Sequence, residues 1–289
     1  MIEKEKFYAI VIWYFPTSEY VRNINSYIDC VSKLIIIDNS DTNNSSLLDD
    51  FDRSKIIYIP NNENKGIASE LNRGCRLAIE AGAQWVLTMD QDSCFLDKDL
   101  HRFIQSANEY DDFEKVAIFS PSYFDPRCNI TKPISEDKYS KINYTMTSGN
   151  ILSLRVLQKV GFFLDYLFID RVDEELCIRI NQFDLQVVRV NSIFMDHYVG
   201  NGTKTIKVFF ITKRYNDYAP IRFYYITRNL FIISKLYPKE AKRLRENWKR
   251  LVLRMIKYDS RSKIQKIIFV LAGIIDFRLG KTGSYKKMV

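Results

Sequence analysis

Val86-Leu87-Thr88-Met89-Asp90-Gln91-Asp92-Ser93 is an apolar run that ends in two carboxylates one residue apart. The apolar part predicts a buried strand, and in an extended chain the side chains of residues i and i+2 leave on the same face. Asp90 and Asp92 would then converge at a strand end, where a parallel sheet opens its binding crevice. Paired carboxylates suit Mg²⁺ or Mn²⁺, and either ion suits a pyrophosphate. The simpler alternative is a strand followed by an aspartate-rich turn, with Ser93 beginning a cap.

Strands alternate with helices in the residues before this stretch. Residues 7–15, 34–37 and 56–59 are nearly unbroken apolar runs, which predicts buried strands. Apolar residues at three- and four-residue spacing predict one helix over residues 21–31, and a second is expected from Ile67 to Ala81. This alternation predicts right-handed βαβ units on a mostly parallel sheet.

The pattern becomes less regular after this stretch. We expect helices at residues 100–110 and 155–160 and from about 173 through Arg179, and strands at 116–120, within 144–154 and at 187–194. The polar stretch 121–142 predicts loop and edge structure. From about Pro220 the pattern is helical and basic, with Pro238 separating two segments.

Composition and charge set the outer bounds. The 289 residues are 46% apolar, enough for one large domain with an extension. Five scattered cysteines without a C-x-x-C pair favour a reducing cytoplasm over a disulfide framework or zinc site. No secretory signal is expected, and the longest apolar run has nine residues against the roughly 20 that span a bilayer.

The charge is unevenly distributed along the chain. Residues 204–289 hold 22 Lys and Arg against 5 Asp and Glu, whereas residues 1–203 hold 21 Lys and Arg against 30 Asp and Glu. Such a basic segment favours polyanions: anionic lipid, phosphorylated substrate or nucleic acid.

Three further polar positions follow strands or open helices. Asp38 ends the second strand, where a carboxylate either accepts from a nucleobase or ribose or caps the next turn. Gly66 opens a helix whose first amides point at whatever binds there, and a glycine allows close backbone approach. Asn72 lies two turns further along, and its alternative role is an ordinary polar helix face.

Together these motifs resemble those of family 2 glycosyltransferases, over about residues 7–200. The order and spacing of the motifs carry the resemblance: Pro16-Thr17, Asp38, Asn64-Lys65-Gly66, Asn72-Arg73-Gly74, Asp90-Gln91-Asp92, Thr147-Ser148-Gly149-Asn150, Asp173-x-Glu175 with Arg179, and His197. Within the family, bacterial rhamnosyltransferases look most similar. That narrower resemblance rests on Asp90-Gln91-Asp92-Ser93, Phe168-Ile169-Asp170-Arg171-Val172-Asp173 with Cys177 and Arg179, and Tyr225 followed by Arg228-Asn229.

The resemblance implies an α/β fold of the GT-A type, with a Rossmann-like mixed sheet. The catalytic domain would span residues 1–203, with a donor half to about 120 and an acceptor half from 121, and residues 204–289 would form a basic helical region. The implied reaction is metal-dependent, inverting transfer of L-rhamnose from dTDP-L-rhamnose to a lipid-linked, growing cell-surface polysaccharide such as O-antigen. Another nucleotide sugar, such as a UDP-hexose, is the alternative.

The resemblance also implies roles for individual residues. Asp38 would bind the donor base, Asp90 would lie near the ribose, and Asp92 would hold Mg²⁺ or Mn²⁺ with Asp90 and His197. The other implied donor-binding residues are Thr17, Asn64, Lys65, Gly66, Asn72 and Gln91, and the implied acceptor-binding residues are Ser148, Gly149, Asn150 and Arg179.

Asp173 is the expected general base for the acceptor hydroxyl. Arg171-Val172 precedes it where the family more often has a Glu-Asp pair, so Asp170, Glu174 and Glu175 remain competitors. Counting back from Arg179 favours Asp173, with Glu175 as an acceptor-site or structural carboxylate.

The basic C-terminal residues suggest an interfacial helix. Residues 240–275 mix Trp248, Leu251 and Met255 with several Lys and Arg residues, which is typical of a helix lying on an anionic leaflet. Because lipid-linked acceptors are common in the family, we expect peripheral attachment to the inner face of the bacterial cytoplasmic membrane. The alternative is a helical hairpin packed on the catalytic domain or on a second copy in a homo-oligomer.

Two other classes fit less well. A nucleotidyltransferase would carry a glycine-rich basic loop after its first strand, where this chain has Phe15-Pro16-Thr17-Ser18. A nucleic-acid-binding protein would use the basic C-terminal region, but the first 203 residues are acidic and show no aromatic-basic stacking motif. His197 could also be a purely structural histidine.

Overall fold

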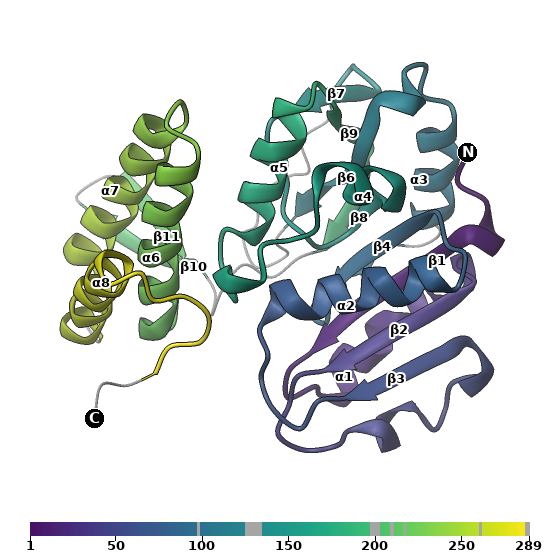
Figure 1. Ribbon diagram of the computed structural model, residues 1–289, viewed down its shortest axis with the longest axis horizontal. Coiled ribbons are helices and arrows are strands. Elements are labelled where there is room, and N and C mark those ends of the chain that lie inside the picture. The colour runs from purple at the N-terminus through teal and green to yellow at the C-terminus, as the bar shows by residue number, and fades with distance from the viewer. Residues whose placement is uncertain are drawn as a thin grey trace. The chain divides into compact units, whose positions relative to one another are not determined.

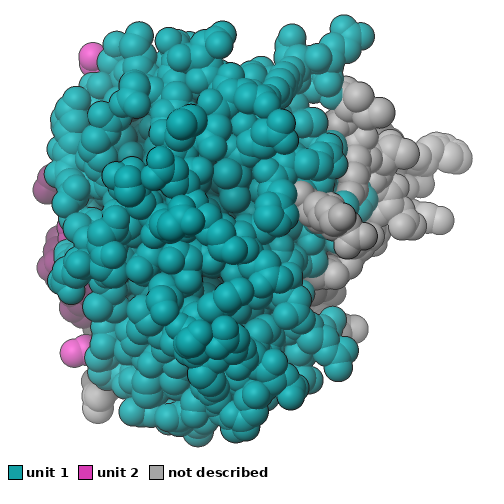
Figure 2. Space-filling model, turned by 90° about the vertical axis from the view of Figure 1, so that its right-hand side faces the viewer, with its two compact units in different colours: residues 1–165, 173–197 teal, residues 166–172, 198–289 magenta. Residues whose placement is uncertain are grey.

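The chain folds into two compact units (Figures 1 and 2). The computed structural model describes residues 1–96, 99–124, 135–196, 203–208, 211–216, 218–259 and 262–286, with 203–208 and 211–216 described by their backbone alone. The sheet unit comprises Met1–Asp165 and Asp173–His197, and the helical unit comprises Tyr166–Val172 and Tyr198–Val289. Residues 166–172 therefore belong to the helical unit, although sheet-unit residues precede and follow them in the sequence.

Four parallel strands form the first half of the main sheet, in the order β3-β2-β1-β4. Their bounds are β1 Phe7–Trp13, β2 Lys33–Asp38, β3 Ile56–Pro60 and β4 Trp85–Asp90, which confirms the strands expected from the apolar runs. Trp13 pairs with Asp38 and Ile12 pairs with Asp90. The carboxyl ends of β1, β2 and β4 therefore meet at one edge of the sheet.

The second half of the sheet is mixed. Strand β8 (Asn150–Ser153) runs antiparallel to both β4 and β6 (Val116–Phe124), while β9 (Gln186–Asp196) is parallel to β6. The short strands β5 (Cys94–Phe95) and β7 (Tyr139–Ile142) pair antiparallel with β9. The fold class of a mixed α/β sheet is confirmed. The parallel strands expected from the alternation before residue 93 are confirmed in the first half of the sheet, whereas the sequence pattern gives no sign of the antiparallel direction of β8.

The helices of the sheet unit are α1 (Ser18–Arg22), α2 (Ile67–Glu80), α3 (Asp99–Asn108), α4 (Leu154–Val160) and α5 (Val172–Gln182). The single helix expected over residues 21–31 is instead α1 followed by 3-10 turns at Asn23–Ser26 and Ile28–Cys30. Asn23 donates its side-chain amide to the Gln91 carbonyl at 2.9 Å, and the Ser26 hydroxyl donates to the Asn23 carbonyl at 2.7 Å. Such side-chain bonds compete with the helical backbone bonds and break the regular helix.

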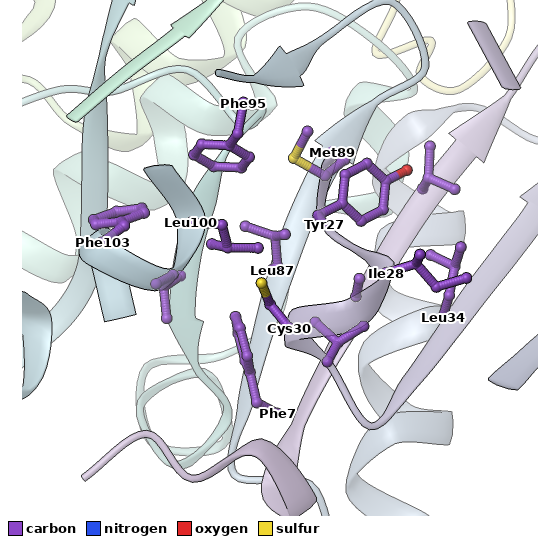
Figure 3. Packing of buried hydrophobic residues seen from close by; sticks show 14 of the residues in the cluster. Phe7, Tyr27, Ile28, Cys30, Leu34, Leu87, Met89, Phe95, Leu100 and Phe103 are labelled. Carbon is purple, nitrogen blue, oxygen red and sulfur yellow. The ribbon is translucent and has the colours of Figure 1, made fainter. Parts of the chain in front are cut away.

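The main core lies between strands β1, β2 and β4, the residue 23–30 segment and α3 (Figure 3). Phe7, Leu34 and Leu87 of the strands gather there with Tyr27 and Ile28 and with Leu100 and Phe103 of α3. On the opposite face of β1, helix α2 approaches closely at Gly74. A Cβ at Gly74 would lie 2.8 Å from the Ile10 side chain, so close packing of helix on strand explains this glycine.

The described residues of the helical unit include an antiparallel pair of strands, β10 (Thr203–Val208) and β11 (Ile211–Asn216), which the sequence pattern does not predict, and three helices. These are α6 (Pro220–Leu236), α7 (Ala241–Tyr258) and α8 (Lys263–Arg278), which confirms the helical pattern from Pro220 and the break near Pro238. Both α7 and α8 pack on α6. Gly273 of α8 allows this approach, because a Cβ there would lie 2.7 Å from the Tyr224 carbonyl oxygen.

None of the helices in the described part of the chain is both long and apolar enough to cross a bilayer.

Candidate active site

The loops after β1 and β4 are tied together by Gln91. Its side-chain amide accepts from the Tyr14 backbone N–H at 2.9 Å and donates to the Tyr14 carbonyl at 3.0 Å. Thr17, a little further along the first loop, caps α1 by accepting from the Tyr20 N–H. Gln91 and Thr17 are two of the residues expected at the donor site, and here they hold the loops that border the sheet edge.

Asp38 is fully buried at the end of β2 and is surrounded by donors. It accepts from the Tyr58 hydroxyl at 2.7 Å, the Asn44 amide at 2.8 Å and the Ser40 backbone N–H at 3.0 Å. Burial alone would raise the pKa of Asp38, but these hydrogen bonds outweigh burial and hold the pKa below its ordinary value. Asp38 is therefore an ionised carboxylate that fixes the loop after β2. Of the two roles considered for it, these contacts are those of a residue that caps the turn after a strand.

The loop before α2 is organised by two asparagines. Asn64 accepts from the Gly66 N–H at 2.9 Å, and Gly66 has a φ of 88°, a conformation that glycine adopts readily. Asn39, next to Asp38, donates to the Gly66 carbonyl at 3.2 Å. Lys65 is exposed and lies 3.4 Å from Glu63. The first turn of α2, with its unpaired backbone amides, is thus held close to the end of β2.

Asn72 of α2 is buried and bonds to the chain beyond α4. It accepts from the Phe163 N–H at 2.9 Å, donates to the Phe163 carbonyl at 2.8 Å and also donates to Asp165. The sequence placed this residue at the donor site or on an ordinary surface, and the structure shows it joining two distant segments of the sheet unit.

The Asp-x-Asp pair spans the end of β4 and the turn that follows. Asp90 is the last residue of β4, whereas Asp92 lies in a turn in which the Ser93 N–H donates to the Asp90 carbonyl at 3.2 Å. The chain is extended only as far as Asp90, so the expectation that Asp90 and Asp92 leave on the same face does not apply, and the turn sets the direction of Asp92. Both side chains are half-buried at the sheet edge.

The loop before β8 braces the end of β4. The Asp90 N–H donates to the Ser148 hydroxyl at 2.9 Å, and the Gly149 N–H donates to the Thr88 carbonyl at 2.6 Å. Gly149 has a φ of 77°, and a Cβ there would lie 2.5 Å from the Met195 sulfur. Asn150 is buried and accepts from the Tyr123 hydroxyl at 3.2 Å. Of the four residues expected to bind the acceptor, Ser148 and Gly149 thus support the end of β4, and Asn150 bonds to β6.

Asp173 lies in the first turn of α5. It accepts from the Tyr144 hydroxyl at 3.1 Å and from the Glu174 backbone N–H at 2.8 Å. It also lines a cavity of about 10 Å³ whose other polar walls include Thr88 and Asn150. The structure thus brings Asp173 close to Thr88 of β4, and Thr88 precedes Asp90 by two residues.

Two of the three carboxylates that compete with Asp173, Glu175 and Asp170, are paired with arginines. Glu175 is fully buried and makes two hydrogen bonds to Arg179, at 2.9 and 2.8 Å, and Arg179 also donates to the carbonyls of Val160 and Phe162. Asp170, in the helical unit, accepts from Arg222 at 2.7 and 2.6 Å. Both pairs join chain segments within a single unit.

The donor set at the sheet edge fits a hard divalent ion. Among the described residues no group of three or more His, Cys, Asp or Glu side chains could hold a metal, and His197 lies outside them. Mg²⁺ usually needs one or two protein carboxylates, with substrate phosphates and water completing its ligands. Asp90 and Asp92 are two carboxylates of the kind that could supply such ligands. A third carboxylate, Asp196, pairs across strands with Cys94, which follows Asp92 by two residues.

Several residues of the site carry no sequence signal. Tyr58, Tyr123 and Tyr144 supply hydroxyls to Asp38, Asn150 and Asp173, yet each stands in the sequence as an ordinary strand or loop tyrosine. Only the pairing of distant segments brings them to their partners.

Comparison with solved structures gives the class. Staphylococcus aureus TarS in complex with UDP-GlcNAc matches with a TM-score of 0.57 at 14% identity, covering 94% of this chain and 80% of that one. The mannosyltransferase PcManGT from Pyrobaculum calidifontis, in complex with GDP-Man and Mn²⁺, matches with a TM-score of 0.59 at 11% identity, covering 96% and 88%. The fold is that of the GT-A glycosyltransferases.

Sequence comparison gives the family. The model of glycosyl transferase family 2 matches residues 20–156. The dTDP-rhamnosyl transferase RfbF of Shigella flexneri is 30% identical over 248 residues, covering 79% of this chain and 79% of the relative. The chain is a glycosyltransferase and belongs to family 2.

Replacing Tyr58 by Phe should lower the free energy of unfolding by about 1.5–3 kcal/mol at pH 7, because a hydrogen bond to the charged Asp38 is lost. The pKa of Asp38 is depressed in the folded state, so its contribution is present above its ordinary pKa of 3.8 and is lost as the pH falls through the lower folded value. The deficit of the variant should therefore shrink below pH 4. Urea unfolding of both proteins between pH 3 and pH 7 measures this, and a deficit that is constant with pH would contradict it.

Proposed function

We propose that this glycosyltransferase transfers L-rhamnose from dTDP-L-rhamnose to a saccharide acceptor, with inversion at the anomeric carbon. The similarity to the dTDP-rhamnosyl transferase RfbF supports the donor. A lipid-linked, growing cell-surface polysaccharide is the proposed acceptor. A UDP-hexose donor remains the competing choice within the family.

Asp173 is the general base of this proposal. The observation that carries it is that Asp173 lines the same small cavity as Thr88 of β4, two residues before Asp90. The acceptor oxygen bonds to the anomeric carbon as the bond from that carbon to the diphosphate breaks, and Asp173 takes the hydroxyl proton. A sugar hydroxyl is a weak acid, so the base must lie within hydrogen-bond reach of it.

The ion pairs of the competing carboxylates support the same assignment. Glu175 and Asp170 each accept two hydrogen bonds from an arginine, so the oxygens of both carboxylates are already used inside the protein. In the proposal, Glu175 and Arg179 instead hold the turn after α4.

Asp92 and Asp90 are the proposed ligands of Mg²⁺ or Mn²⁺, with His197 as a further ligand. When bound, the ion supplies positive charge that stabilises the leaving diphosphate. Thr17, Asp38, Asn64, Lys65, Gly66, Asn72 and Gln91 shape the proposed donor site around it, directly or through the loops that they hold. Ser148, Gly149 and Asn150 border the proposed acceptor side.

One set of transfer assays tests both the donor and the base. The sugar donors offered are dTDP-rhamnose, UDP-glucose, UDP-GlcNAc and GDP-mannose. The wild type should consume dTDP-rhamnose fastest. Asp173→Asn should keep its affinity for dTDP-rhamnose and lose transfer by about 10²–10⁴-fold, whereas the control Glu174→Gln should transfer normally. Faster turnover of another donor would refute rhamnose, and near-normal transfer by Asp173→Asn would refute the base.

The metal role is tested by calorimetry with dTDP and Mn²⁺. Asp92→Asn should weaken the Mn²⁺-dependent binding of dTDP by roughly tenfold or more, because a neutral amide is a poorer ligand for a hard cation. Asp111→Asn changes an exposed carboxylate of the sheet unit and should bind as the wild type does. Equal binding by Asp92→Asn and the control would remove Asp92 from the metal site.

A peripheral position on an anionic membrane is also proposed, but through a different face from the one the sequence suggests. Met255 is buried, and Trp248 packs on α6 and donates to the Thr227 hydroxyl at 3.0 Å. That apolar face of α7 is therefore used inside the helical unit. Helix α8 instead exposes an aliphatic stripe: Ile264, Ile268, Leu271, Ile275 and Leu279, each 44% to 75% exposed.

The charge of the neighbouring helix favours an anionic bilayer as the occupant of this stripe. Helix α7 exposes seven basic side chains: Lys242, Arg243, Arg245, Lys249, Arg250, Arg254 and Lys257. Each basic side chain near an anionic leaflet adds about 1 kcal/mol of attraction. A second copy of the chain would bring the same positive charge to the interface, which disfavours a dimer through this face.

Vesicle binding tests this position. Binding should rise with anionic lipid and fall with salt, and the double variant Ile268→Ser/Leu271→Ser should bind at least tenfold more weakly. The control Phe183→Ser removes an exposed apolar side chain from the sheet unit and should bind as the wild type does. Unchanged vesicle binding by the double variant, or a dimer in solution that the double variant dissociates, would contradict a bilayer contact through α8.

A further inference from the structure

The segment from Tyr166 to Val172 has an unusual backbone. Phe168, Asp170 and Arg171 have φ values of 65°, 66° and 61°, in the left-handed region that residues with a side chain rarely adopt. Three such residues within four positions persist only where the surroundings hold them, and backbone strain of this kind concentrates at functional sites.

Two buried residues of α6 hold this segment. The Asn229 side-chain amide donates to the carbonyls of Leu167, Ile169 and Asp170 at 2.9, 2.8 and 2.9 Å. Arg228 donates to the Leu167 carbonyl at 3.1 Å and to the Gly283 carbonyl at 2.6 Å. Both side chains are fully buried, so this backbone is held by donors inside the helical unit.

The side chains of the segment are held as well. Asp170 accepts two hydrogen bonds from Arg222, and Arg171 donates to the Ile226 carbonyl at 3.2 Å. The Phe168 ring stacks on Tyr225 with centroids 5.3 Å apart. Every one of these partners is on α6, so one helix fixes the segment along its whole length.

This segment leads directly into the helix that carries the proposed base. Val172 is the first residue of α5 and Asp173 is the second. The backbone that α6 holds therefore ends one peptide bond before Asp173. A displacement of 1 Å at a reacting group can reduce a rate by about 10²-fold.

We infer that Arg228 and Asn229 are positioning residues, which fix the Tyr166–Val172 segment and through it the Asp173 carboxylate. The inference rests on the proposed function for its effect on catalysis. It gives one physical reason for two separate motifs of the sequence, Phe168 to Asp173 and Tyr225 with Arg228-Asn229, because the first is the strained segment and the second is its holder.

Asn229→Ala is the main test, and Thr227→Ala is its matched control. Thr227 is also fully buried on α6, but its hydroxyl accepts a hydrogen bond from Trp248 of α7. Arg222→Lys is a milder second variant, since Arg222 is 38% exposed and the change keeps a charge beside Asp170 while losing the two-bond contact.

Two readouts are measured on the full-length chain. The first is hydrogen exchange at the Leu176 and Cys177 amides, which report on the first hydrogen-bonded turn of α5. The second is rhamnosyl transfer, with kcat and the affinity for dTDP measured separately. In Asn229→Ala, exchange should be at least tenfold faster and kcat roughly 10–100-fold lower, with dTDP affinity unchanged. Arg222→Lys should show smaller changes of the same kind, and Thr227→Ala should show neither.

Equal exchange at Leu176 and Cys177 in Asn229→Ala and Thr227→Ala would overturn the inference. So would faster exchange without any loss of kcat. If Asn229→Ala does not fold, an Arg222→Lys variant with wild-type exchange and kcat overturns it. If the wild type transfers no sugar, the proposed function fails, and the exchange measurement still decides whether the α6 residues fix the start of α5.

Discussion

The parallel register of β1, β2 and β4 is the constraint on which the site depends. Because Trp13 pairs with Asp38 and Ile12 with Asp90, three chain segments must turn at one edge of the sheet. Each turn leaves backbone N–H and carbonyl groups without strand partners, and buried groups of this kind must be satisfied. The polar side chains near this edge do so: Gln91 for Tyr14, Asn39 for Gly66 and Ser148 for Asp90.

This constraint explains why so many motif residues bond to other segments of the protein. Asn72 joins α2 to Phe163, and Arg179 joins α5 to the turn after α4. A side chain that bonds to the main chain of a distant segment fixes the distance between its own segment and that one. A catalytic site needs such fixed distances more than it needs additional polar groups. A sequence motif of this family therefore records the frame of the site as much as the groups that contact substrate.

The sequence predicted the elements whose signal is local and missed those set by distant partners. The strands β1, β2, β3 and β4 follow from apolar runs, and α2 follows from its periodicity and from Gly66. The direction of β8 and the break after α1 depend on partners far along the chain, such as Gln91 for Asn23. The same holds for the site. Asp38 and Asp90 stand out by their places at strand ends and Asp173 by the family resemblance, but Tyr58 and Tyr144 become visible only when the sheet brings them to Asp38 and Asp173.

The rotation of helix α8 about its own axis is also set by contacts with distant segments. Hydrophobicity alone would turn its isoleucines inward, yet Ile264 and Ile268 are exposed while Lys266 and Asp276 are buried. Lys266 pairs with the buried Asp259 and lies 5.4 Å from the Phe223 ring centre, and Asp276 accepts from the Tyr224 hydroxyl at 2.8 Å. A buried charge without its partner costs several kcal/mol. Turning α8 by half a turn would separate both pairs, and Gly273 would no longer meet the Tyr224 carbonyl. The polar contacts of α8 thus specify which of its faces points inward, and the aliphatic stripe is exposed as a consequence.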